Sequence, residues 1–204
     1  GRADGGHEGG PFGVTAMEYR IALVKGDGIG PEVVEAAVAA LDRIGAKFGR
    51  TFQYCDVLAG GAAIDALGEP LPKESVEACR RCGAVLLGAV GGPKWDAAPA
   101  DKRPERAILG LREALGLYVN LRPAKLQPAL MAASPLRADL AREGIDLVIV
   151  RELTGGIYFG ERGRAGDTAF DTERYSVEEV RRVGVRGFEL AMQRRKRLVS
   201  VDKA

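Results

Sequence analysis

From Tyr19 onward the sequence alternates between short apolar segments and amphipathic segments, and this alternation restricts the fold more than any other feature. The apolar segments are rich in Val, Ile and Leu, whereas the segments between them carry apolar residues at helical spacing. Such alternation predicts an α/β fold with largely parallel strands. Strands are expected within residues 19–30, 50–60, 84–92, 118–126, 145–153 and 198–203, and helices within residues 31–49, 72–83, 104–117, 134–144 and 176–197.

Residues 154–175 interrupt this pattern, because they are rich in Gly, Thr, Asp and Arg and have no helical period. Long segments without regular structure are usually functional or interfacial, so we expect an extended, hairpin-like arm. Ser176 and Glu179 have the spacing of a capping box, and Ser134 is a candidate cap for the preceding helix. The pattern predicts a first α/β domain over residues 17–117 and a second domain, with the arm, over residues 118–204.

Residues 1–16 are rich in glycine and nearly devoid of apolar side chains, which predicts a disordered tail. We assign no function to His7, the only histidine in the chain. The net charge of +2, with acids and bases interleaved except near residues 194–197, indicates no nucleic-acid partner. Neither a membrane span nor a signal peptide is evident in the sequence, so we expect a cytoplasmic protein without a membrane partner.

Cys79 and Cys82 form a C-x-x-C pair, which is a pattern of zinc sites and redox sites. Structural zinc requires four ligands, and neither a second cysteine pair nor a histidine cluster accompanies them. We therefore favour ordinary free thiols in a reducing compartment.

Two glycine turns follow predicted strands. In residues 26–33, GDGIGPEV, the turn leads into a helix and can present backbone N–H groups to an anion, although we favour a plain tight turn. The spacing differs from the G-x-G-x-x-G dinucleotide fingerprint. In residues 88–96, GAVGGPKWD, Gly91 and Gly92 allow a ligand to approach the backbone closely.

Arginines at strand ends are the strongest candidates for binding. Arg122 and Arg151 each follow apolar strand residues, and Arg112 lies on a predicted helix. Guanidinium groups bind carboxylates in a bidentate manner, so the three together suit a substrate with two carboxylates. Tyr158 in the arm is a candidate proton donor, and Lys203 after the last predicted strand is a candidate base.

Six segments in register resemble the front portion of the isocitrate/isopropylmalate dehydrogenase family, in its 3-isopropylmalate-oxidising branch. They are GDGIGPEV, LLGAVGGPKWD, LGLREALGLYVNLRPAKL, VIVRELTGGIYFGE, DTERYS and SVDKA. The resemblance implies that family's two-domain fold, here incomplete and with an extended arm. It also implies NAD-dependent oxidative decarboxylation of 3-isopropylmalate to 2-oxoisocaproate in leucine biosynthesis.

The resemblance assigns roles to residues of this chain. It implies that Arg112, Arg122 and Arg151 hold the two carboxylates, that Tyr158 protonates the enol, and that Lys203 is the general base, acting in the partner subunit's site.

By the same resemblance, Ile108 and Leu109 contact the isopropyl branch, where a charged carboxylate would be costly to desolvate. Arg106, next to this pocket, weakens the assignment of the exact substrate. Cofactor contacts are implied for the nicotinamide side of NAD, at Gly91, Gly92, Pro93, Lys94 and Glu105.

The family also uses Mg²⁺ or Mn²⁺, and the resemblance implies that its aspartate ligands lie beyond residue 204, together with most of the adenosine site. We therefore expect a chain truncated after Ala204, inactive alone, from a protein that is a homodimer at full length. Two alternatives stay open: another β-decarboxylating dehydrogenase acting on tartrate, homoisocitrate or isocitrate, and a standalone anion- or nucleotide-binding module.

Overall fold

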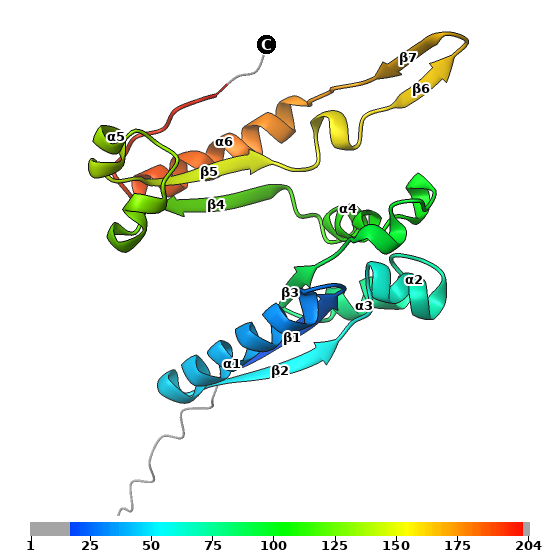
Figure 1. Cartoon of the computed structure of the whole chain (residues 1–204), viewed down its shortest axis with the longest axis horizontal. Helices are drawn as coiled ribbons and strands as arrows, with labels where there is room; N and C mark the ends of the chain where they lie inside the picture. The colour runs from blue at the N-terminus through cyan, green and yellow to red at the C-terminus, as the bar shows by residue number, and fades with distance from the viewer. Residues whose placement is uncertain (1–16, 202–204) are drawn as a thin grey trace, which may run out of the picture. The chain divides into compact units, whose positions relative to one another are not determined.

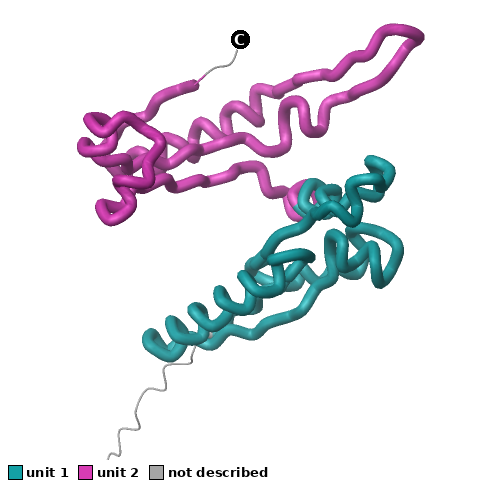
Figure 2. Tube along the Cα trace, viewed as in Figure 1, with its two compact units in different colours: residues 1–111 teal, residues 112–204 magenta. Residues whose placement is uncertain are grey.

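The computed structural model describes residues 17–201, and the chain divides into two compact units, residues 1–111 and 112–204 (Figure 2). The strands are β1 (Met17–Gly26), β2 (Arg50–Asp56), β3 (Ala84–Ala89), β4 (Val119–Lys125), β5 (Asp146–Glu152), β6 (Arg162–Ala165) and β7 (Thr168–Asp171). The α-helices are α1 (Gly30–Phe48), α2 (Gly61–Leu67), α3 (Lys73–Arg80), α4 (Glu105–Ala114), α5 (Ala138–Arg142) and α6 (Val177–Met192). Short 3₁₀ helices are η1 (Pro93–Trp95), η2 (Ala100–Lys102), η3 (Pro128–Ala133) and η4 (Gly156–Tyr158).

Unit 1 is built on a parallel three-stranded sheet of order β2-β1-β3, which confirms the α/β prediction (Figure 1). In β1, the four consecutive residues 21–24 are all buried. Because successive strand residues face opposite sides, this burial means that both faces of the central strand are covered. On one face, Ile21 and Leu23 form the core with Val34 of α1.

Helix α1 has the sequence signals expected of it. Pro31 lies in its first turn, where the missing N–H costs no hydrogen bond. The helix ends at Phe48, and the next residue, Gly49, adopts φ 62° and donates its N–H to the Gly45 carbonyl. Proline at the start and a left-handed glycine just past the end therefore fix the length of the helix that covers the sheet.

Unit 2 pairs β4 with β5 in an antiparallel ladder, with α6 packed against β5. The largely parallel arrangement expected from the alternation is thus wrong for this unit. Residues 126–145, which contain η3 and α5, bring the chain back so that β5 runs opposite to β4 (Figure 1). None of the helices within residues 17–201 has both the length and the apolar content that a membrane span requires.

The expected arm is present as the antiparallel hairpin of β6 and β7 (Figure 1). The capping box that begins α6 is also confirmed. Glu179 donates its backbone N–H to the Ser176 hydroxyl, and its carboxylate accepts the Ser176 backbone N–H at 2.6 Å. The arm thus begins after β5 and ends at the capped first turn of α6.

Two expectations about elements are wrong, and one helix was missed. Ser134 does not cap a helix, because α5 begins only at Ala138, and the Ser134 hydroxyl instead accepts the Leu136 N–H. Residues 198–201 form no strand, since no described strand pairs with them, and Val199 is 75% exposed. Helix α2 was not anticipated, because its N-cap position holds Gly60, which offers no side-chain cap.

Candidate functional site

One face of the β4–β5 ladder gathers two of the predicted binding residues. Asn120 lies directly opposite Arg151, and Arg122 lies opposite Ile149. Since alternate residues of a strand share a face, Asn120, Arg122 and Arg151 project from the same side of the sheet. Val148, Val150 and Glu152 project from the other side, where α6 packs.

Arg122 and Arg151 are diagonal neighbours on this face. Diagonal neighbours in an antiparallel pair lie roughly 7–8 Å apart, within reach of one small ligand for side chains as long as arginine. Arg122 donates from Nε to Asn120 Oδ1 at 3.0 Å, which orients its guanidinium while leaving its other N–H groups to bind an anion. Two cations on one exposed face, with no acidic side chain at the facing positions of β4 and β5, favour binding of a dianion.

Tyr158 joins the same group through Arg151. Its phenol oxygen accepts a hydrogen bond from the Arg151 guanidinium at 2.8 Å, and the guanidinium carbon lies 5.3 Å from the ring centroid. Because the oxygen is the acceptor in this bond, the phenol hydrogen stays available for donation. The side chain is 46% exposed, so a ligand can reach it. The structure thus brings Arg122, Arg151 and Tyr158 together.

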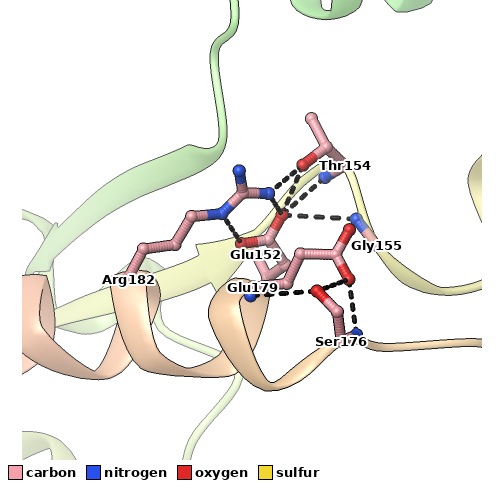
Figure 3. Close-up of polar contacts among 6 residues, drawn as sticks. All are labelled: Glu152, Thr154, Gly155, Ser176, Glu179 and Arg182. Atoms are coloured by element: carbon pink, nitrogen blue, oxygen red, sulfur yellow. Dashed lines mark hydrogen bonds and ion pairs between the residues drawn. The ribbon is translucent and has the colours of Figure 1, made fainter.

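On the opposite face, Glu152 and Arg182 form an ion pair behind this group (Figure 3). The Glu152 side chain is only 8% exposed. Burial acts to raise the pKa of Glu152, but the hydrogen bonds from Arg182 and Thr154 outweigh it and hold the pKa below its usual value. Glu152 therefore stays ionised at the end of β5.

Helix α4 carries a row of the other predicted residues. These residues share one face of the helix, because three of them follow Glu105 by three, four and seven positions: Ile108, Leu109 and Arg112. Ala107 and Leu111 are buried on the opposite side, whereas Ile108 and Leu109 are half-buried. Arg112 lies at the boundary of the two units, and its place beside Arg122 and Arg151 stays a prediction.

In unit 1, the turn at Gly91 is held by a buried carboxylate. Asp27, 8% exposed, accepts the Gly91 N–H at 2.9 Å and the Gly61 N–H at 2.7 Å. Gly91 adopts φ 103°, a conformation that favours glycine, and a Cβ atom there would lie 2.4 Å from a Glu105 carboxylate oxygen, so Glu105 approaches the turn closely. The turn after β3 is therefore a fixed backbone surface with Glu105 beside it.

The remaining predicted cofactor residues follow this turn. Gly92 precedes η1, which Pro93 begins. The Lys94 amine pairs with Asp65 at 2.5 Å and lies 5.1 Å from the Trp95 ring centroid. Lys94 is thus positioned by its neighbours, and its contact with a cofactor stays a prediction.

Other predicted features have no site in the described structure. Lys203 and His7 lie outside the described residues. Within residues 17–201, no group of three or more His, Cys, Asp or Glu side chains is placed to hold a metal ion. Cys79 and Cys82 are free thiols. Burial raises the pKa of Cys79, so a smaller fraction of this thiol is ionised to the reactive thiolate.

Three supporting residues were missed from the sequence: Asn120, Asp27 and Glu152. Asn120 had a readable signal, because it stands two positions before Arg122 on the same strand face. Asp27 bonds to residues 34 and 64 positions away, so no local pattern identifies it. Glu152 follows Arg151 directly, and strand alternation alone places it on the opposite face.

Comparisons with known proteins match this architecture. A family model described as "Isocitrate/isopropylmalate dehydrogenase" matches residues 20–204. A "3-isopropylmalate dehydrogenase" from Clostridium pasteurianum is 56% identical, over 92% of this chain and 54% of its own length. One from Aquifex aeolicus is 52% identical, over 92% and 52%. The chain thus spans about half the length of these curated relatives.

Solved structures agree with the fold. A "beta-decarboxylating dehydrogenase" from Thermococcus kodakarensis has a TM-score of 0.61 at 34% identity, over 86% of this chain and 46% of that protein. An isocitrate dehydrogenase from Methylococcus capsulatus has a TM-score of 0.66 at 26% identity, over 86% and 48%.

Proposed function

Since the chain belongs to the isocitrate/isopropylmalate dehydrogenase family, we propose that it forms part of an NAD-dependent enzyme that oxidises and decarboxylates 3-isopropylmalate to 2-oxoisocaproate, a step in leucine biosynthesis. The observation that carries the proposal is the shared face of Arg122 and Arg151, with the Tyr158 phenol hydrogen-bonded to Arg151. This arrangement suits a dicarboxylic acid that must be held and then protonated.

The arginines bind the two carboxylates of the substrate, with Arg112 as the proposed third member. Asn120 holds the Arg122 guanidinium in place, so less conformational entropy is lost when the diacid binds. Fixing both carboxylates aligns the secondary alcohol between them for oxidation.

The proton inventory follows from these groups. Lys203 is the proposed base that takes the hydroxyl proton as the alcohol becomes a ketone. A bound NAD supplies the acceptor for the hydride that leaves the carbon bearing this hydroxyl group. Loss of carbon dioxide from the β-keto carboxylate, with return of the proton from Lys203 to the keto oxygen, then gives an enol. Tyr158 donates its phenol hydrogen to the enol carbon as the enol O–H proton goes back to Lys203, which leaves the product ketone.

The half-buried aliphatic pair on α4 supports the branched substrate over a tricarboxylate. Ile108 and Leu109 offer no hydrogen-bond donor, so a third carboxylate placed there would lose its hydration without compensation. An isopropyl group gains from the same contact. Arg106 is exposed on the neighbouring helix position, which makes isocitrate the competing substrate to exclude by experiment.

The proposed nicotinamide contact is the turn of Gly91 and Gly92, with Pro93 and Lys94 following and Glu105 alongside. The positive φ of Gly91 and the close approach of the Glu105 side chain support this, because they leave the backbone of the turn open to a ligand beside a carboxylate. We assign no metal-binding role to residues 17–201, since they supply no suitable donor set. The cytoplasmic location and the homodimer of the full-length protein belong to this proposal.

Steady-state assays with the complete reading frame that carries these residues test the function. With NAD and Mg²⁺, we expect the highest kcat/KM on 3-isopropylmalate among 3-isopropylmalate, isocitrate, homoisocitrate and tartrate. Residues 1–204 alone are expected to give no turnover. Faster turnover of isocitrate would overturn the role given to Ile108 and Leu109, and turnover by residues 1–204 alone would show that they hold a complete site.

Arg151→Lys is the sharpest single test of the diacid site. Lysine keeps the charge but loses both the bidentate fork and the bond to Tyr158, so we expect kcat/KM to fall by about 100-fold or more. Arg181→Lys is the matched control, because Arg181 is an exposed arginine that pairs with Glu178 elsewhere in the unit. Equal kinetics of the two variants would contradict the site.

A further inference from the structure

Two adjacent residues at the end of β5 act on opposite sides of the sheet. Arg151 projects to the candidate diacid face and contacts Tyr158. Glu152 projects toward α6. Only the five residues 153–157 separate Glu152 from Tyr158, which ends η4. The position of the phenol therefore depends on how this short loop is held.

The Glu152 carboxylate is the acceptor for the first turn of that loop (Figure 3). Its Oε1 accepts the Thr154 N–H at 2.8 Å, the Thr154 hydroxyl at 2.7 Å and the Gly155 N–H at 3.2 Å. Arg182 of α6 donates to Oε1 at 2.8 Å and to Oε2 at 3.2 Å, and also to the Thr154 hydroxyl. One carboxylate thus ties the loop backbone to both the strand and the helix.

The other side of the loop is closed by the segment that precedes α6. Gly156 donates its N–H to the Arg174 carbonyl at 2.9 Å. A Cβ atom at Gly155 would lie 2.7 Å from the Tyr175 ring, and one at Gly156 would lie 2.5 Å from the Tyr175 hydroxyl. The loop is therefore confined between Glu152 and Tyr175.

We propose that Glu152 is a positioning residue, whose carboxylate holds the loop so that the Tyr158 phenol meets Arg151 in the diacid site. This inference rests on the proposed function, in which Tyr158 donates a proton to the enol. Glu152 does not itself contact the substrate. Its effect is carried by the backbone N–H groups of Thr154 and Gly155, and the ion pair with Arg182 orients the carboxylate that receives them.

A purely structural tie between strand and helix is the competing explanation, and the same strand contains a matched control. At the other end of β5, Asp146 pairs with Arg194 at 2.6 Å, just beyond the end of α6. Within residues 17–201, the Asp146 carboxylate accepts from arginine side chains and not from any loop backbone. Asp146→Ala thus removes another ion pair between β5 and an arginine just beyond the end of α6, although a more exposed one, without touching the Tyr158 loop.

The first experiment reads the position of Tyr158 directly and needs no activity. The 204-residue chain contains five tyrosines, so labelling with 3-fluorotyrosine gives few ¹⁹F resonances, and Tyr158→Phe assigns the relevant one. We expect Glu152→Ala to shift or broaden the Tyr158 resonance, whereas Asp146→Ala leaves it unchanged. Glu152→Gln keeps an oxygen acceptor for the loop N–H groups and is expected to restore the wild-type position.

If Glu152→Ala does not fold, Thr154→Val provides a milder change. Valine preserves the volume but removes the hydroxyl that links Glu152 to Arg182. A smaller displacement of the same Tyr158 resonance is then expected. An unmoved resonance in every folded variant at positions 152 and 154 would overturn the inference.

The second experiment measures kinetics in the complete enzyme. Displacement of a proton donor by about 1 Å costs roughly 100-fold, so we expect Glu152→Ala to lower kcat by about that factor, with KM for the diacid within about threefold of wild type. Equal losses in Glu152→Ala and Asp146→Ala would indicate a structural tie and overturn the inference. A displaced Tyr158 resonance in a protein inactive on all four acids would instead refute the proposed function and leave the positioning role intact.

Discussion

In unit 1, the candidate cofactor turn is a backbone surface held by a buried carboxylate, whereas in unit 2 the candidate diacid site is a row of side chains on an exposed sheet face. The turn at Gly91 depends on Asp27, and the adjoining turn after β1 contains glycines with positive φ, of which Gly26 lies directly against the backbone of β3. The face with Arg122 and Arg151 depends on strand register alone. Substitutions in the turn of unit 1 should therefore cost stability, and substitutions on the face of unit 2 should cost function.

The largest effect is expected at Gly26, at the end of β1. It adopts φ 73°, and a Cβ atom there would lie 1.9 Å from the Ala89 carbonyl oxygen. Because the clash is with backbone of the adjacent strand, Gly26→Ala should destabilise unit 1 by at least about 4 kcal/mol. Urea unfolding followed by the fluorescence of Trp95, the only tryptophan, reports on this unit.

Gly28 in the same turn is the matched control. It adopts φ 57°, but a Cβ atom there would meet no other atom within 4 Å, so only the left-handed conformation opposes alanine. We expect Gly28→Ala to cost about 1–2 kcal/mol. Equal costs at the two glycines would mean that backbone conformation, and not the close approach of β3, determines the turn.

Asp27 should give the second-largest effect. Replacing Asp27 by alanine leaves the N–H groups of Gly61 and Gly91 without their acceptor, at about 1–3 kcal/mol each, for a loss of about 2–4 kcal/mol after partial hydration. Asp27→Asn retains one carbonyl oxygen and should lose less. Asp65→Ala removes the exposed pair with Lys94 in the same unit and should cost under about 1 kcal/mol.

A loss below about 1 kcal/mol for Asp27→Ala would break the comparison, because the turn of unit 1 would then be held by something other than this carboxylate. If Asp27→Ala loses a large amount of unfolding free energy while the Trp95 emission spectrum of its folded state stays unchanged, the comparison is sharpened, because the carboxylate then stabilises the turn without changing its conformation. Trp95 lies against Gly61, one of the two residues that Asp27 holds, so its spectrum reports whether the turn has moved.

Sequence reasoning was most successful where local chemistry determines local structure. The strands of unit 1 were predictable because β1 is buried on both faces and so reads as a continuous apolar run. The start of α6 was predictable because the capping box is a pattern four residues long. That Arg122 and Arg151 follow apolar strand residues was readable from the sequence, although Arg122 lies in the middle of β4 and not at its end. Their role in binding stays a prediction.

The failures have physical reasons as well. Leu198 to Val201 is β-branched and apolar, but a strand needs a partner, and Leu198 instead packs near Gly187 of α6. The antiparallel direction of β5 depends on the path of residues 126–145, which no periodicity reveals. Asp27 joins segments that are distant in sequence, so its role appears only when the fold brings them together.

The smallest expected effect concerns pH and lies in unit 2, behind the side-chain face. The pKa of Glu152 is held below the ordinary glutamate value of 4.5, so the folded state binds its proton less readily than the unfolded state does. The ionised carboxylate therefore stabilises the fold fully above pH 4.5, and this stabilisation is lost as the pH falls through the lowered pKa. Glu152→Gln cannot ionise and should lack this contribution.

Urea unfolding followed by circular dichroism between about pH 7 and pH 3 measures the difference. Near neutral pH, wild type should exceed Glu152→Gln by on the order of 1 kcal/mol, and the two should converge at the acid end. Asp146→Asn is the control, because Arg194 also lowers the pKa of Asp146, but at an exposed site where solvent screens the pair. Identical pH profiles for wild type and Glu152→Gln would show that Glu152 adds no ionic stabilisation beyond its role as a hydrogen-bond acceptor for the loop that bears Tyr158.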